Sequence, residues 1–396
     1  MKISSIISKS TLFDKLVLGN LALVGLIIWL TINNSSQAMI STVFYCTFFI
    51  LIWCIFEHPF LIRREISQMV ALISVLSFVN VLISSAMGNG SFGFNYFVNY
   101  FTFVFLLLYM MLMCSYKPSY TIGIAILWIG LGVAAIYAFS FYVLHIVGGD
   151  FIGYFTMNFS NPNLLAMFLY LSVLFCFVSF FILQKYFLKA LCAIIGVADF
   201  NLMMMAESRN CIISFAMVVV VTIYFMIQKK YRISPWILKF VAVFPLIFVW
   251  LYLNYVTVLH VKDDTMMNHE GKSIMSRTHI WNYIFDHLEI HNYIFGNYPM
   301  LQGNVHNSHL AVLASFGVIV AILFVVFLYK VMKSCSENIS SYKQAVCLVG
   351  FMGTIFIGMA EGALVCGSLG WCIPACTFLC LASVDWSGQN KLNSPK

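Results

Sequence analysis

Long apolar stretches make up most of the chain, and short polar segments separate them. Each stretch is about 20 residues long, the length that an α-helix needs to cross the hydrocarbon core of a bilayer. The pattern therefore predicts twelve membrane-spanning helices. They cover approximately residues 16–32, 39–57, 66–86, 96–114, 119–146, 163–184, 187–206, 210–228, 236–258, 308–330, 344–361 and 364–384.

The basic residues test this arrangement, because lysine and arginine collect in loops that stay in the cytoplasm. With the N-terminus inside, 17 of the 21 basic residues fall in inner segments. The outer segments keep only Arg209, Lys262, Lys272 and Arg277. We therefore expect both termini in the cytoplasm and the polar loop over residues 259–307 on the outside, facing the periplasm or the cell exterior.

Composition supports a polytopic membrane protein and excludes other classes. The chain is 62% hydrophobic and 9% charged, which is far from the composition of a soluble domain. Its net charge of +7 follows mainly from the inner loops, so it gives no case for nucleic-acid binding. No small-residue cleavage site follows Leu30, so we expect the first helix to be an uncleaved anchor. We expect one integral membrane domain over residues 1–396.

The outer loop concentrates the histidines, seven of the nine lying between His260 and His309. This clustering suggests zinc, but the loop contains no H-E-x-x-H pattern. We therefore expect no metal and no other cofactor. Cys372, Cys376 and Cys380 share one helical face, where packing is favoured over metal ligation because thiolates are costly in hydrocarbon.

Within the outer loop, apolar residues from Ile280 to Leu288 recur at helical spacing after Ser276, a candidate N-cap. The spacing predicts an amphipathic helix that lies against the membrane surface. Arg277 precedes Trp281 by four residues and so shares its face. It is either an interfacial arginine that extends toward water or an arginine that binds phosphate on a lipid-linked substrate.

His306 lies where the polar loop meets the next spanning helix, which opens with Asn307-Ser308-His309. Imidazole titrates near neutral pH, so a histidine here can act as a general base. A solvated polar residue is the alternative. His309 lies one turn later and is either a second ligand or a packing residue.

Two further polar segments precede spanning helices on the outer side. Placing an arginine at a membrane boundary costs free energy, so we favour a functional role for Arg209 over a structural pair with Glu207 or Asp199. In Asn161-Pro162-Asn163, the first residue can cap a helix and the proline suits its first turn.

Taken together, these segments resemble the O-antigen polymerase and O-antigen ligase superfamily in order and spacing. The resemblance covers roughly residues 150–320, and the twelve-helix topology extends it to the whole chain. The motifs that carry it are Phe159-Ser160-Asn161-Pro162-Asn163-Leu164-Leu165-Ala166, Ser208-Arg209, Ser276-Arg277 with Trp281 and Phe295-Gly296-Asn297, and Val305-His306-Asn307-Ser308-His309-Leu310 with Phe316-Gly317.

The resemblance implies an all-α, GT-C-like membrane glycosyltransferase of the bacterial inner membrane. Such an enzyme is metal-independent and uses an undecaprenyl-diphosphate-linked oligosaccharide, with inversion at the anomeric carbon. Arg209 and Arg277 would neutralise the leaving diphosphate, and His306 would orient or deprotonate the acceptor hydroxyl. Glu361 is a candidate acid near the same site. The candidate contacts to sugar or phosphate are Asn163, Asn307 and His309.

Within the superfamily, a polymerase transfers the chain to another lipid-linked repeat unit, whereas a ligase transfers it to lipid A core. We favour the polymerase because the loop between Arg277 and His306 is short, which leaves little structure for docking lipid A core. Its expected partners are the lipid-linked oligosaccharide, bilayer lipids and a chain-length regulator protein. The alternative from another class is a transporter or flippase, which predicts paired interrupted helices that the sequence does not show.

Overall fold

The computed structural model describes residues 10–57, 64–87, 94–148, 155–228, 231–256, 266–267, 273–274, 277–296, 305–359, 361 and 369–387. Almost all of this part is helical. The elements before the outer loop are α2 (Leu12–Ile32), α3 (Gln37–Glu57), α4 (Arg64–Ala86), α5 (Phe94–Ser115), α6 (Tyr120–Tyr142), α7 (Pro162–Ile182), α8 (Tyr186–Met205), α9 (Arg209–Gln228), α10 (Pro235–Leu251) and the π-helical turn η1 (Tyr252–Val256).

The outer loop and the C-terminal part hold the remaining elements. Two short strands pair antiparallel within the loop, a local departure from the all-α expectation. The elements are β1 (Met266–Met267), β2 (Ser273–Ile274), α11 (Arg277–His287), α12 (Ile290–Phe295), α13 (Ser308–Ser336), α14 (Tyr342–Ile357) and α15 (Leu369–Leu381).

Each apolar stretch of the sequence coincides with one of these helices. Among the described residues, nine helices are long and apolar enough to cross a membrane. Shorter apolar helices over Tyr100–Ser115, Tyr342–Ile357 and Trp371–Leu381 match the other three stretches. Large apolar side chains in the middle of helices, such as Val197 of α8 and Val220 of α9, are exposed on the outside of the bundle, where lipid tails can cover them. The chain is a polytopic helical membrane protein.

Hydrogen bonds join helix ends in the groups that an alternating up-and-down path predicts. At one end of the bundle, the Tyr116 hydroxyl after α5 donates to Asp14 of α2, and Ser383 Oγ after α15 donates to Tyr116 O at 2.8 Å. At the other end, Asn158 Nδ2 before α7 donates to Ile32 O of α2 at 2.7 Å. Helix starts and ends that are distant in the sequence therefore meet on common faces.

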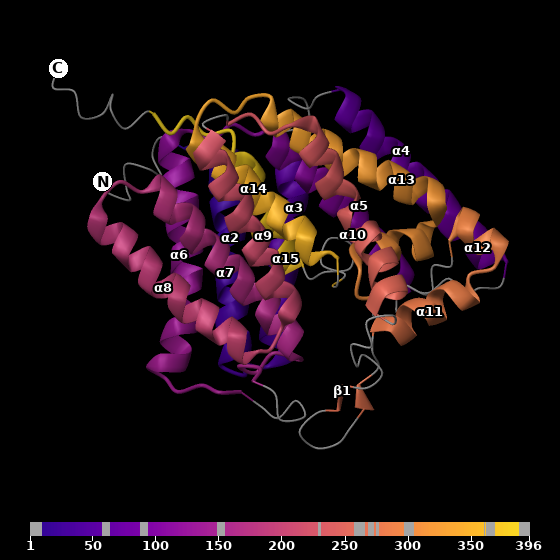
Figure 1. Ribbon diagram of the computed structural model, residues 1–396, viewed down its shortest axis with the longest axis horizontal. Helices are drawn as coiled ribbons and strands as arrows, with labels where there is room; N and C mark the ends of the chain where they lie inside the picture. The colour runs from indigo at the N-terminus through magenta and orange to yellow at the C-terminus, as the bar shows by residue number, and fades with distance from the viewer. Residues whose placement is uncertain are drawn as a thin grey trace.

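α12 lies beside α13 and α4 at the right of Figure 1, and α11 lies at the lower right, below α10. The predicted amphipathic helix is present as α11, whereas its expected cap, Ser276, lies outside the described residues. Trp281 is fully buried and packs edge-on against Phe248 and Tyr252, with ring centroids 6.3 and 5.2 Å away. The apolar face of α11 therefore contacts α10 and η1, and its central side chain is covered by protein instead of by the membrane surface.

α13 is not the straight helix that the apolar pattern predicts, because it bends at Gly317, where φ is 83°. Asn80 of α4 donates from Nδ2 to Phe316 O at 2.6 Å, which satisfies a carbonyl at the bend. Gly296, after α12, also has φ of 83°. A Cβ atom on either glycine would overlap the backbone of the other segment. The Phe295-Gly296 and Phe316-Gly317 motifs thus form one close contact between α12 and α13.

Candidate functional site

The carboxyl end of α14 is the point at which the candidate site is assembled. We call Ile357, Gly358, Met359 and Glu361 the α14 platform. The last carbonyl groups of a helix have no partner within it and need donors from elsewhere. Three donors reach the platform: Asn210 Nδ2 to Ile357 O (3.0 Å), Ser308 N to Gly358 O (2.9 Å) and Asn307 Nδ2 to Met359 O (2.8 Å). The starts of α9 and α13 are therefore fixed to the same short segment.

Asn307 is the N-cap of α13, since its Oδ1 accepts from Leu310 N at 2.8 Å. Its Nδ2 also donates to Pro245 O of α10 at 2.9 Å. The His309 ring contacts Ala242 O of the same helix, with Nε2 at 2.8 Å. Proline inside a helix removes the backbone donor to the carbonyl four residues before it and disturbs the turn around it. Both side chains satisfy backbone around Pro245, which favours a positioning role over the substrate contacts expected of Asn307 and His309.

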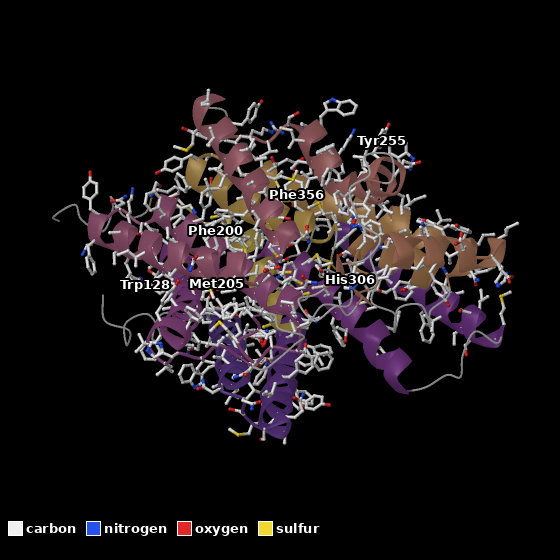
Figure 2. The ribbon with its side chains drawn as sticks, turned by 60° about the horizontal axis from the view of Figure 1, so that its bottom comes forward. Trp128, Phe200, Met205, Tyr255, His306 and Phe356 are labelled. Carbon is white, nitrogen blue, oxygen red and sulfur yellow. The ribbon has the colours of Figure 1, made fainter. Side chains whose placement is uncertain are left out.

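His306 directly precedes Asn307, and its imidazole ring is the candidate general base. Its Nδ1 lies 3.1 Å from Glu361 Oε2. The exposed fraction of the His306 side chain is 19% and that of Glu361 is 9%, so the carboxyl group lies deeper than the ring. Ser308 Oγ donates to the Glu361 carbonyl oxygen at 3.1 Å, which holds the backbone of the acid against α13. In Figure 2, His306 lies near the centre of the face that the view brings forward.

The backbone at the site is strained. His306 has φ of 50° and Glu207 has φ of 55°, in the left-handed region that residues other than glycine rarely adopt. Such a conformation costs about 1–2 kcal/mol and persists where the surroundings determine it. His306 is itself a predicted site residue, and Glu207 lies two residues before Arg209.

α11 is tied to the same place through its indole. Trp281 Nε1 donates to Val305 O at 2.8 Å, on the residue before His306. Arg277 is the first residue of α11, one helical turn before Trp281. Arg209 is the first residue of α9, next to Asn210. The side chains of both arginines lie outside the described residues, but the helix starts that carry them adjoin the His306 segment and the α14 platform.

Asn163 stands apart from this assembly. It is half-buried in the first turn of α7, after Pro162. Asn161 caps this helix, and its Oδ1 accepts from Leu164 N at 2.8 Å. The cap and the proline follow the sequence prediction. Hydrogen bonds between described residues do not connect Asn163 to the α14 platform.

Several residues that build the site escape sequence reasoning. Asn210, Asn80 and Trp281 hold backbone carbonyls through single hydrogen bonds, and a sequence carries no sign of such partners. Glu361 has a detectable signal, because an acid among apolar residues is a functional candidate by default. Its partner is visible only in the fold.

In the part of the chain that the structure describes, no group of three or more His, Cys, Asp or Glu side chains is arranged to hold a metal ion. Cys372, Cys376 and Cys380 are completely or almost completely buried in α15. The chemistry available at the site is a histidine paired with a carboxylate, beside two helix starts that carry arginine. This set suits proton transfer next to an anionic group.

Comparison with protein-family models found no match, and comparison with curated proteins found none.

Proposed function

We propose that the chain is a membrane glycosyltransferase of the O-antigen polymerase type. It takes an undecaprenyl-diphosphate-linked glycan and transfers it to a sugar hydroxyl of another lipid-linked repeat unit. On this proposal the protein is a GT-C-like enzyme with twelve spans in the bacterial inner membrane. Both termini are cytoplasmic, and the site faces the periplasm.

The observation that carries the proposal is the meeting of two helix starts at the α14 platform, with a third helix joined to the residue before His306. Hydrogen bonds from Asn210 and Asn307 join the starts of α9 and α13 to it, and Trp281 joins α11 to the residue before His306. These are the helices on which the sequence placed Arg209, His306 and Arg277. A structural scaffold gives no reason for a histidine and two arginines from distant segments to be brought to one end of an apolar bundle.

The reaction needs little beyond this set. A diphosphate is a good leaving group, so charge neutralisation and positioning supply most of the catalysis. Arg209 and Arg277 bind the diphosphate, and His306 takes the proton of the acceptor hydroxyl as that oxygen attacks the anomeric carbon. A single displacement inverts the anomeric centre, and no step calls for a metal.

The short loop between Arg277 and His306 favours the polymerase over a ligase, because it offers little surface for docking lipid A core. Two structured pieces, α11 and α12, already occupy much of that loop and pack against α10 and α13. A chain-length regulator protein is the expected protein partner.

The test is complementation of a strain in which the gene is deleted, followed by a gel of surface polysaccharide. The variants are His306→Ala, Arg277→Ala and Arg209→Ala. Two matched controls are His291→Ala, which removes a histidine paired with exposed Glu289 at 3.3 Å, and Arg232→Ala, which removes an exposed arginine. We expect the site variants to abolish transfer with normal membrane insertion, and the controls to behave as wild type.

The deletion phenotype separates the two reactions. Lipid A core that bears a single repeat establishes a polymerase. Core without any repeat, together with accumulated lipid-linked polymer, establishes a ligase. An unaltered ladder in the deletion strain, or full activity of His306→Ala, contradicts the proposal.

A further inference from the structure

Glu361 belongs to a different segment from His306, and hydrogen bonds to backbone carbonyls join the two segments. Ser308 N and Ser308 Oγ donate to the carbonyl oxygens of Gly358 and Glu361, at 2.9 and 3.1 Å. Asn307 fixes the opposite side of the same turn through Met359 O. The 3.1 Å contact between the imidazole and the carboxyl group is therefore set by the packing of α13 on α14.

The protonation pattern of the ring follows from this contact. An ionised carboxylate can only accept a hydrogen bond, so the hydrogen lies on His306 Nδ1 and points at Glu361 Oε2. Nε2 then keeps its lone pair and is the ring atom that can accept a proton. The carboxyl group is more deeply buried than the ring. This burial fits a residue that orients the base, and not one that contacts the substrate.

The remaining His–Glu pair among the described residues shows the contrast. His291 Nδ1 lies 3.3 Å from Glu289 Oε2, but the Glu289 side chain is 76% exposed. Both residues of that pair belong to the start of α12, and water screens the interaction. The His306–Glu361 pair joins two elements, is largely desolvated and lies at a strained φ. Its electrostatic effect on the ring is correspondingly larger.

We propose that Glu361 is the positioning residue for His306: it fixes the ring with Nε2 as the proton acceptor and stabilises the imidazolium that forms during transfer. The inference rests on the proposed function and deepens it. As the acceptor oxygen forms its bond to the anomeric carbon, the bond from that carbon to the diphosphate oxygen breaks, and the diphosphate leaves with the electron pair. The hydroxyl proton moves to Nε2, and the positive charge is balanced by Glu361. The imidazolium later releases that proton to water.

The kinetic test uses lipid-linked repeat units extracted from the deletion strain as substrate for the purified full-length protein. A positioned general base contributes about 100-fold to 10,000-fold to rate. We expect Glu361→Gln to lower kcat by about 100-fold with little change in KM, because Glu361 does not touch the donor. The matched control is Glu65→Gln, which removes a carboxylate paired with Lys330 at 3.0 Å from the other half of α13. We expect it to keep the wild-type rate.

A conservative variant separates positioning from a purely structural ion pair. The amide of Glu361→Gln carries no charge and can turn its NH2 group toward Nδ1, so it neither fixes the ring tautomer nor balances the imidazolium. Glu361→Asp keeps a carboxylate that accepts from Nδ1, and we expect it to recover much of the kcat that Glu361→Gln loses. The other charged and titratable residues on the elements that meet here are unchanged in these variants: Glu207, Arg209, Arg277, His279, Asp286, His287, Glu289, His291 and His309.

A second readout needs no substrate and no activity. Diethyl pyrocarbonate acylates a free imidazole nitrogen, and mass spectrometry of the peptide that contains His306 follows the rate of its modification at one fixed pH. We expect the rate at His306 to change in Glu361→Gln, because the ring loses the carboxylate that fixes Nε2 as the free nitrogen, and the rate at His291 to stay unchanged. This measurement also tests a variant whose transfer activity is too low to measure.

The outcomes distinguish the two proposals. If His306→Gln transfers glycan at the wild-type rate, the proposed function fails. If His306→Gln is inactive while Glu361→Gln keeps the wild-type transfer rate and the wild-type rate of His306 modification, the proposed function stands and the positioning role of Glu361 is overturned.

Discussion

Replacing Asn307 separates a positioning role from a substrate contact. The side chain is fully buried and makes three hydrogen bonds: it accepts from Leu310 N and donates to Pro245 O and Met359 O. If these contacts are its function, removing them lowers the free energy of unfolding. If Asn307 instead holds sugar or phosphate, as the resemblance implies, a substitution lowers transfer and leaves stability in place.

The magnitude follows from the three bonds. Loss of an N-cap side chain costs about 1 kcal/mol. Pro245 O lies within the α10 helix, so losing this second donor costs about 0.5–1.5 kcal/mol, whereas loss of the donor to buried Met359 O costs about 1–3 kcal/mol. Asn307→Ala should therefore lower stability by about 2–5 kcal/mol, allowing for partial relaxation. Asn307→Asp keeps the size and the cap but sets a carboxylate against two carbonyl oxygens, so we expect at least as large a loss.

The assay can use the protein's own cysteines. Ten of the eleven described cysteines are buried, so a thiol-reactive fluorogenic dye reports unfolding on heating in detergent. The matched control is Asn254→Ala, which removes an exposed amide that donates to Trp250 O at 2.7 Å. We expect a large drop in the apparent unfolding temperature for Asn307→Ala and Asn307→Asp and almost none for the control. An unchanged unfolding temperature, with loss of transfer only, refutes the positioning role.

Three further substitutions test other parts of the structure. Gly317→Ala should lower stability by about 2–4 kcal/mol, because Gly317 has a left-handed φ and an added Cβ would overlap the backbone of α12. The same dye assay measures this loss. Wild-type stability of the variant would contradict the contact between α12 and α13. Trp281→Phe removes the donor to Val305 O. If this hydrogen bond contributes about 1.4 kcal/mol to positioning His306, the rate of transfer with lipid-linked repeats falls roughly tenfold. An unchanged rate would show that α11 does not position the site. Asp199→Asn should leave stability unchanged or raised, since both carboxyl oxygens are buried without a partner among the described residues; a clear loss in the unfolding temperature would instead support a pair with Arg209.

The pattern of apolar helices could be predicted because apolar length in a membrane chain is a local property. Each of the twelve stretches contains a helix, and the boundaries at Pro162 and Arg209 agree with the caps and charges read from the sequence. The bend at Gly317 was not predicted, because its cause is the approach of a second segment, at Gly296, that the local pattern does not contain. The burial of Trp281 against protein was missed for the same reason, since an apolar helix face looks alike whether lipid or a neighbouring helix covers it.

The site was predictable only in its chemistry. A histidine at a membrane boundary and an arginine at a helix start are costly there, so both stand out as candidates. Which candidates meet depends on long-range pairing. Glu361 is 55 residues from His306, and Asn210 is 147 residues from Ile357. Asn307 and His309 matched the chemistry of a substrate site, yet the fold uses both to satisfy backbone near Pro245.

Side chains at the site both satisfy backbone groups at helix ends and adjoin the candidate catalytic groups, and this double role has a physical origin. In hydrocarbon every backbone polar group needs an internal partner, so helix ends and proline breaks within a membrane bundle must be met by side chains. At the α14 platform those side chains come from helix starts that also carry the candidate catalytic groups. Substitutions there therefore couple: Ser308→Ala removes a donor to the Glu361 carbonyl and also loosens the partner of His306. The effects of Ser308→Ala and Glu361→Gln on transfer should be less than additive, because both act on the orientation of one imidazole ring.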